Sequence, residues 1–370
     1  MDQRLKKLAK LLVHYSTRIT KDDFVFIRCN DAASEWMAAV AEEAVKTGAH
    51  VETMMNSEDV AEAVLKHSTP DQLREGSYIM EQIMAKATVF LTAWGGRNTR
   101  VNAGIDPEKL KFSSQGAKKW RALYSERCGN GSMRWCGTQF PTQSDAQEAN
   151  MSLADYTEFV YGAGLLDKDD PVAEWKRISA EQDRWVNYLN TKKEIRIVSK
   201  DTDITVNVAG RTWINCDGQA NFPDGEVFTS PVEDGVNGTI SFSFPGIYNG
   251  KEIEGIRLEV KNGVVVKATA EKGGELLKAL LETDEGAVRF GEVAIGTNYG
   301  IQQFTRNMLF DEKIGGTVHM AIGDSMPDAG GKNRSSIHWD MLCDMRTGGK
   351  IWADGELFYE NGKFINSLLK

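Results

Sequence analysis

Hydrophobic residues in the first half of the chain alternate between short continuous runs and longer segments of helical period. The opening residues place Leu5, Leu8, Leu12 and Tyr15 on one side of an amphipathic helix. Short apolar runs follow, separated by segments with helical spacing. The runs that read as strands are 24–27, 50–54 and 88–92, and the helical segments are 32–47 and 60–86, the latter holding one or two helices. Strands buried on both faces and separated by helices predict a parallel sheet with a Rossmann-like α/β layer.

The second half has a different period. A long helix is expected over residues 171–190, because Asp170 suits the N-cap, Pro171 suits the first turn, and Trp175 and Trp185 keep near-helical spacing. After residue 195 the apolar positions alternate with a period of two. The alternating positions are Ile204, Val206 and Val208, then Ile256, Leu258 and Val260, then Val264 and Val266. The Asn262-Gly263 pair between two such runs predicts a β-hairpin.

The change of period predicts two domains. We expect an α/β domain over residues 1–191 and a β-rich α+β domain over residues 192–370 that carries the functional site. A hydrophobic content of 41% is ample for two packed cores.

Charge and cysteine content restrict the class of protein. The 44 basic and 53 acidic residues give a net charge of −9, which disfavours nucleic-acid and anionic-membrane partners and permits substrates that carry an ammonium group. No stretch is long and apolar enough to span a bilayer. The five cysteines are odd in number and widely spaced, so neither a disulfide framework nor a zinc finger is expected. These features favour a cytoplasmic protein.

Two histidines near the C-terminus are the first candidates for chemistry. His338 and Asp340 are two residues apart, which in extended chain places an imidazole and a carboxylate on one face, and His319 lies upstream. Glu226 and Glu292 each stand between a glycine and an apolar run, where a buried carboxylate is costly unless it is paired or metal-bound.

The candidates together indicate metal. Glu312, seven residues before His319, completes a set of oxygen and nitrogen ligands that is too rich for one tetrahedral ion and fits two divalent ions better. Each piece alone has a plainer interpretation. A single histidine beside an acid is more often structural, and a Gly-Glu pair is more often a turn with a solvated acid. Their joint occurrence favours the metal site.

The segments that carry these residues resemble the thermophilic-aminopeptidase family of metallopeptidases over nearly the whole chain. The resembling segments are 221–231, 291–298, 309–319 and 336–340, with a less specific one over 138–148. The resemblance implies metal-ligand roles for Glu226, Glu292, His319, His338 and Asp340, with Glu312 as a sixth. It also implies two divalent ions, zinc, cobalt, manganese or magnesium, and a homodimer that acts on short peptides with free N-termini.

One position departs from the family pattern. The family usually has a tyrosine seven residues after the first histidine, where its hydroxyl can stabilise the oxyanion, and here that position is Met326. A thioether cannot donate a hydrogen bond. Either another donor substitutes, with Tyr299, Lys332 and Arg334 as candidates, or peptide hydrolysis is weak or absent.

The resemblance therefore implies a hydrolase, a dinuclear metallo-aminopeptidase, with Glu292 and a donor such as Tyr299 or Lys332 in catalytic roles. Two alternatives remain. A mononuclear Fe(II) ring-cleaving dioxygenase on the same scaffold would use the two histidines and Asp340 as a facial triad, but Glu226 and Glu292 would then add surplus negative charge. An inactive peptide-binding protein is supported only by Met326.

Overall fold

The computed structural model describes residues 2–248 and 250–369, and the chain forms two compact units. The first unit comprises Met1–Glu174 and Gly218–Pro223. The second comprises Trp175–Asp217 and Asp224–Lys370.

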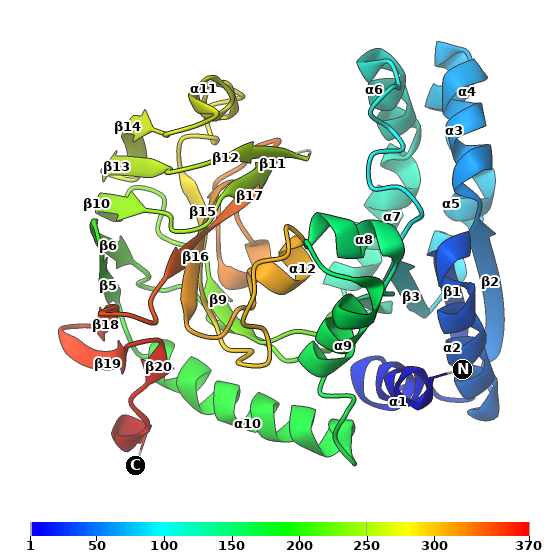
Figure 1. The fold of residues 1–370 in the computed structure, drawn as a ribbon, viewed down its shortest axis with the longest axis horizontal. Coiled ribbons are helices and arrows are strands. Elements are labelled where there is room, and N and C mark those ends of the chain that lie inside the picture. Colours follow the sequence, from blue (N-terminus) through cyan, green and yellow to red (C-terminus); the bar gives the residue numbers. More distant parts are fainter. Residues whose placement is uncertain (1, 249, 370) are drawn as a thin grey trace. The chain divides into compact units, whose positions relative to one another are not determined.

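The first unit contains a five-stranded parallel sheet in the order β2-β1-β3-β4-β8. Figure 1 labels three of its strands, β1, β2 and β3. Its strands are β1 (Phe24–Asn30), β2 (His50–Asn56), β3 (Val89–Trp94), β4 (Arg134–Gln139) and β8 (Asn221–Phe222). The continuous apolar runs of β1 and β3 are buried on both faces, as a central parallel strand requires. The predicted α/β layer is confirmed.

Helices connect these strands. They are α1 (Gln3–Leu11), α2 (Ser34–Lys46), α3 (Glu58–His67), α4 (Pro70–Glu75), α5 (Tyr78–Lys86), α6 (Pro107–Gly116), α7 (Lys118–Gly129), α8 (Gln143–Glu148) and α9 (Leu153–Ala163). The sequence predicted one or two helices over residues 60–86, and the structure has three there. Thr69 closes a capping box with Gln72 and starts α4, and Gly76, with φ of 77°, ends it.

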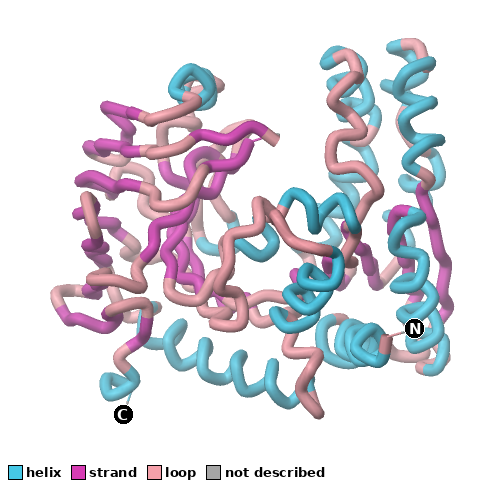
Figure 2. The backbone as a smooth tube through the Cα atoms, viewed as in Figure 1, coloured by secondary structure: helices cyan, strands magenta, loops and turns pink. Residues whose placement is uncertain are grey.

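The second unit is rich in strands, drawn in magenta in Figure 2. An eight-stranded antiparallel sheet runs in the order β14-β13-β10-β6-β5-β18-β19-β20. Its strands are β5 (Glu194–Ser199), β6 (Thr202–Asn207), β10 (Val236–Ser241), β13 (Arg257–Lys261), β14 (Val264–Thr269), β18 (Lys350–Ala353), β19 (Glu356–Glu360) and β20 (Lys363–Phe364). The predicted hairpin is confirmed, because β13 and β14 pair across Asn262 and Gly263.

A second antiparallel sheet has the order β17-β16-β15-β9-β7, and β11 and β12 form a separate ribbon. The strands are β7 (Ile214–Cys216), β9 (Glu226–Thr229), β11 (Gly246–Tyr248), β12 (Lys251–Ile253), β15 (Phe290–Gly296), β16 (Thr317–Gly323) and β17 (His338–Asp344). The helices of this unit are α10 (Pro171–Leu189), whose residues up to Glu174 belong to the first unit, α11 (Gly274–Leu281) and α12 (Met308–Asp311). One apolar core joins both large sheets.

The units divide at the start of α10, while the change of sequence period lies near residue 191, where this helix ends. Trp185 and Leu189 account for the difference, because both are buried in the core of the second unit. α10 thus packs with the β-rich half although its period resembles that of the helices before it.

No helix among the described residues combines the length and the hydropathy that a bilayer crossing requires. In the part of the chain that the structure describes, none of the five cysteines forms a disulfide.

Candidate metal centre

Four neighbouring strands of the second unit bring acidic and imidazole side chains to one face of a sheet. Register places Glu292 of β15 opposite Ala321 of β16, and Ala321 opposite Asp340 of β17. His319 lies two residues before Ala321, so both side chains point to the same face. Gly296 stands opposite Glu226. Small residues thus alternate with the ligand candidates and leave room above the sheet.

The side chains on the opposite face of these strands pack into the core and hold the strands in register. Val293, Ile295, Val318, Met320 and Ile322 are almost fully buried in the core of the second unit. Because side chains alternate between faces, this apolar packing fixes which residues of the strands face the ligand cluster.

Glu292 lies between the two histidines. Its Oε1 is 3.5 Å from Nε2 of His319, and its Oε2 is 3.3 Å from Nε2 of His338. His319 Nε2 also lies 3.2 Å from Oε2 of Glu226, and His338 Nε2 lies 3.5 Å from Oδ2 of Asp340. One carboxylate therefore faces two separate imidazole-carboxylate groups.

These contacts form overlapping sets that could each hold an ion. One set is Glu226, Glu292 and His319, another is Glu292, His338 and Asp340, and a third is Glu312, His319 and Asp340. All six metal ligands predicted from the sequence come together here.

Buried atoms without hydrogen bonds are consistent with a cation in this cluster. Among the described residues, Oε2 of Glu226, Nε2 of His319 and Oδ1 of Asp340 are buried and make no hydrogen bond. Polar atoms in such positions are costly unless something else satisfies them. Carboxylate and imidazole groups without thiolate suit divalent ions of the zinc, cobalt or manganese kind.

His338 is oriented by the backbone. Its Nδ1 is 2.8 Å from the carbonyl oxygen of Asp324, which can accept a hydrogen bond from an N–H at this position. Such a contact places the proton on Nδ1 and leaves Nε2 for the cluster, which is the usual outer support of a metal-binding histidine.

The charges of the site shift the pKa values of its members. Burial alone would raise the pKa of Glu292, but contacts with His319 and His338 outweigh it and lower the pKa to about 2. Burial would lower the pKa of His338, but Asp340 and Glu292 raise it to about 12, and that of His319 rises to about 9 against its own burial through Glu292 and Glu226. Without a metal ion, both imidazoles therefore hold protons at neutral pH.

A lysine that the sequence reasoning missed lies inside the cluster. Lys313 is completely buried, and its Nζ is 3.1 Å from Oε1 of Glu226 and 3.7 Å from Oδ1 of Asp224. It also contacts the carboxylate of Glu312. Three carboxylates around one ammonium group hold the pKa of Lys313 well above its usual range, although burial acts in the opposite direction.

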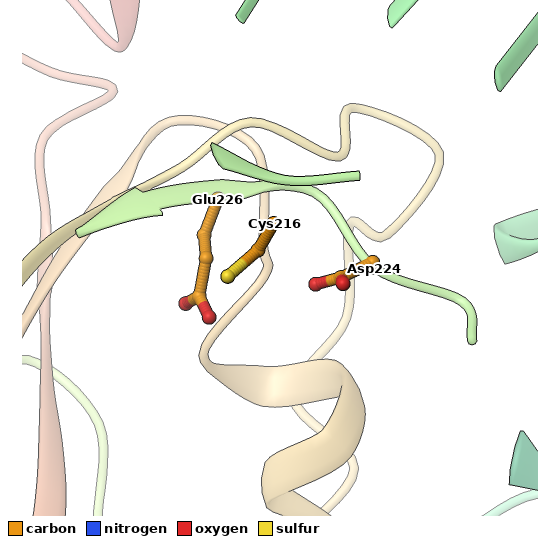
Figure 3. A group of neighbouring side chains, drawn as sticks. All are labelled: Cys216, Asp224 and Glu226. Carbon is orange, nitrogen blue, oxygen red and sulfur yellow. The ribbon is translucent and has the colours of Figure 1, made fainter. Parts of the chain in front are cut away.

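Cys216, Asp224 and Glu226 form a further group (Figure 3), and their possible ligand atoms lie within 4.8 Å of one another. Cys216 of β7 stands opposite Glu226 of β9. Gly225 allows this geometry, because with φ of 122° it passes so close to Asn298 that a Cβ would lie 2.7 Å from that residue's Cβ. Asp224 lies two residues before Glu226 in the same segment, 221–231. This closeness in the sequence is the signal that could have identified Asp224 as a site residue.

The structure does not bring the proposed replacement donors into the cluster. The hydroxyl of Tyr299 donates to the carbonyl oxygen of Gly362, at 2.9 Å. Lys332 is exposed, and its backbone N–H donates to Glu233. The guanidinium of Arg334 donates to the carbonyl oxygens of Ser325 and Asn333. Met326 is half-buried, and its backbone N–H donates to Oγ of Ser230, at 3.0 Å.

Comparisons with curated proteins find relatives along the whole chain. Aminopeptidase 2 of Geobacillus stearothermophilus is 29% identical over an alignment that covers 92% of each chain. Aminopeptidase AmpS of Bacillus subtilis is 28% identical with 98% of each chain covered, and aminopeptidase T of Thermus thermophilus is 27% identical with 97% of this chain and 96% of the relative covered.

Solved structures with the same fold include wild-type AmpT from Thermus thermophilus. The TM-score is 0.86 at 24% sequence identity, with 98% of this chain and 99% of that chain covered. A 2,5-dihydroxypyridine dioxygenase from Pseudomonas putida KT2440 shares the fold more distantly, with a TM-score of 0.62 at 14% identity, covering 99% of this chain and 98% of that one.

The family pattern described as thermophilic metalloprotease (M29) matches residues 1–364. A match of this extent includes every residue of the candidate centre, and the chain therefore belongs to the thermophilic metalloprotease family.

Proposed function

We propose that this protein is an aminopeptidase that removes N-terminal residues from short peptides at a centre of two divalent ions. One observation carries the proposal. Glu292 presents one carboxylate oxygen to each of two histidines, and each histidine has a further acid of its own, Glu226 or Asp340. A carboxylate shared between two groups is the arrangement expected of a dinuclear hydrolase.

The residues of the site divide into two groups with Glu292 in common. Glu226 and His319 would hold one ion, and His338 and Asp340 would hold the other. When bound, the ions lower the pKa of water and polarise the scissile carbonyl.

Glu312 can move a proton in this site. Burial raises the pKa of its carboxyl group, so it can accept and release a proton nearer neutral pH than an exposed glutamate. It lies in the set with His319 and Asp340 and keeps partial access to solvent, because its side chain is 18% exposed. A proton accepted there could pass to the leaving amine.

The acidic site also suits the substrate. A free peptide N-terminus carries an ammonium group, which the surplus of carboxylates attracts, and an acetylated N-terminus lacks this charge.

A mononuclear dioxygenase is the weaker candidate. Its facial triad would need only His319, His338 and Asp340, and the buried Glu226 and Glu292 would then place two further carboxylates beside a single ion. The distant fold similarity to a dioxygenase does not supply a reason for these two acids.

We further propose a cellular compartment and an oligomeric state. The enzyme would be a cytoplasmic homodimer, with zinc, cobalt, manganese or magnesium as its ions. Cysteines that form no disulfide support a reducing compartment, and the oxygen and nitrogen ligands support these metals.

The test is hydrolysis of short peptides with free N-termini before and after chelation. Activity should vanish on chelation and return with Co(II), Zn(II) or Mn(II), and N-acetylated versions of the same peptides should be poor substrates. Full activity in chelator, or equal turnover of acetylated peptides, would exclude the proposed function.

A further inference from the structure

The lysine inside the cluster has no role in the reaction proposed above. Lys313 follows Glu312, the C-cap residue of α12, is 0% exposed, and contacts the carboxylates of Asp224, Glu226 and Glu312. A buried charge of this kind persists only where partners offset its loss of hydration. Three acids around one ammonium group meet this condition.

The ammonium group lies against two of the three side chains that would have to hold a third metal ion. Cys216, Asp224 and Glu226 offer ligand atoms within 4.8 Å of one another, which is a set that could hold an ion (Figure 3). Lys313 Nζ already bridges two members of this set, at 3.7 Å from Asp224 and 3.1 Å from Glu226. Two cations cannot share these oxygens without strong repulsion.

The same contact orients a ligand of the neighbouring group. Oε1 of Glu226 accepts a hydrogen bond from Lys313, while Oε2 faces His319 Nε2 at 3.2 Å. Lys313 thus leaves one oxygen of Glu226 for the set that contains Glu292 and His319, and it directs the other oxygen away from that set.

We propose that Lys313 is a positioning residue, an internal cation that closes the Cys216, Asp224 and Glu226 group to metal and holds Glu226 in place for the adjoining metal group. This inference rests on the proposed function only in taking the neighbouring groups as metal-binding. Its consequence is that the number of ions bound and the exclusion of a thiolate ligand depend on one side chain.

The first experiment titrates the metal-free wild-type protein and the Lys313→Ala variant with Co(II). The variant should take up one more ion per chain than the wild type and should show a thiolate-to-cobalt charge-transfer band that the wild type lacks. The band should disappear in Lys313→Ala combined with Cys216→Ser. Equal uptake by variant and wild type, without a thiolate band, overturns the proposal.

A second measurement keeps the proposal testable if Lys313→Ala does not fold. Thermal unfolding is compared for four metal-free proteins, namely the wild type, Asp224→Asn, Lys313→Met and the double variant. Asp224→Asn should lower Tm in the wild type but raise it in the Lys313→Met protein, because there it removes an acid that has lost its cation. A loss of equal size in both backgrounds contradicts the inference.

Neither readout involves peptide hydrolysis. A protein that fails to cleave peptides but gains a cobalt-thiolate site on loss of Lys313 would refute the proposed reaction and retain this inference. An active aminopeptidase without that gain would do the reverse.

Discussion

Glu292 is the residue whose two carboxylate oxygens connect the halves of the metal centre. Its Oε1 faces His319 and its Oε2 faces His338, at 3.5 and 3.3 Å. The amide of Glu292→Gln would keep the shape but lose the negative charge that a bridging position needs. We expect metal affinity to fall by more than the roughly 10- to 100-fold that loss of an outer support of a ligand costs.

Peptide turnover of Glu292→Gln should fall with metal content, while circular dichroism should show an intact fold. Metal analysis after dialysis measures the loss. Glu259→Gln, which changes an exposed glutamate on β13, is the matched control and should behave as wild type. Near-normal turnover and metal content in Glu292→Gln would make Glu292 a structural acid.

Met326 stands where the family usually has a hydroxyl donor. The Tyr299 hydroxyl donates to Gly362, the Arg334 guanidinium donates to Ser325 and Asn333, and Lys332 is exposed, so none of these three replaces that donor in this structure. We expect Met326→Tyr to raise kcat on short peptides, by up to the roughly 10²- to 10³-fold that one oxyanion donor is worth, with metal content unchanged.

Tyr299→Phe is the companion variant and should leave turnover unchanged. A loss of activity in Tyr299→Phe, with no gain in Met326→Tyr, would show that Tyr299 supplies the donor in spite of its bond to Gly362.

At the scale of the element, β15, β16 and β17 keep an apolar face in the core and a ligand face above it. Ala321 is the small residue opposite both Glu292 and Asp340, and it is fully buried. Ala321→Leu should place a branched side chain in the space between these acids. We expect weaker metal uptake and a stability cost of about 1–3 kcal/mol from overpacking.

The control for this variant lies on the other face of the same strand. Met320→Leu conserves volume in the core, so it should cost less than about 1.5 kcal/mol and leave metal uptake unchanged. Calorimetry and metal titration of both variants separate the two faces. Wild-type metal affinity in Ala321→Leu would contradict the assignment of the ligand face.

Strand alternation was visible in the sequence where it was regular. The Asn262-Gly263 turn and the apolar runs of β1 and β3 have local causes, and they were predicted correctly. The period of α10 does not tell which core the helix packs against, so the sequence did not indicate that Trp185 and Leu189 lie in the core of the second unit. β8 has only two residues and could not be recognised from its pattern.

Five of the metal-ligand candidates could be predicted because of their place in or beside apolar strands. Each of Glu226, Glu292, His319, His338 and Asp340 interrupts or borders an apolar strand, where an acid or imidazole needs a partner. Lys313 follows Glu312 directly, and such a pair usually lies on a solvated turn. Its complete burial depends on acids that lie far away along the sequence, so local pattern did not reveal it.

At the scale of the whole molecule, the histidines of the metal-free centre are protonated, and metal ions must displace these protons. The pKa values of about 9 for His319 and about 12 for His338 mean that both are protonated at pH 7, and metal ions bind only the deprotonated imidazole. Metal uptake should therefore release protons, and affinity should increase as pH rises toward 9. Titrations with Zn(II) or Co(II) between pH 6 and 8, in weakly buffered solution, measure both effects. Affinity that does not change with pH would contradict this account.

The number of metal ions per chain distinguishes a dinuclear centre from a mononuclear or metal-free one. The protein is loaded with Co(II) or Zn(II), freed of excess metal, and measured by elemental analysis alongside Glu292→Gln. We expect two ions per wild-type chain and a loss of metal in the variant, because Glu292 contacts both histidine groups. A single tightly bound iron per chain, or no metal in either protein, would contradict the dinuclear centre.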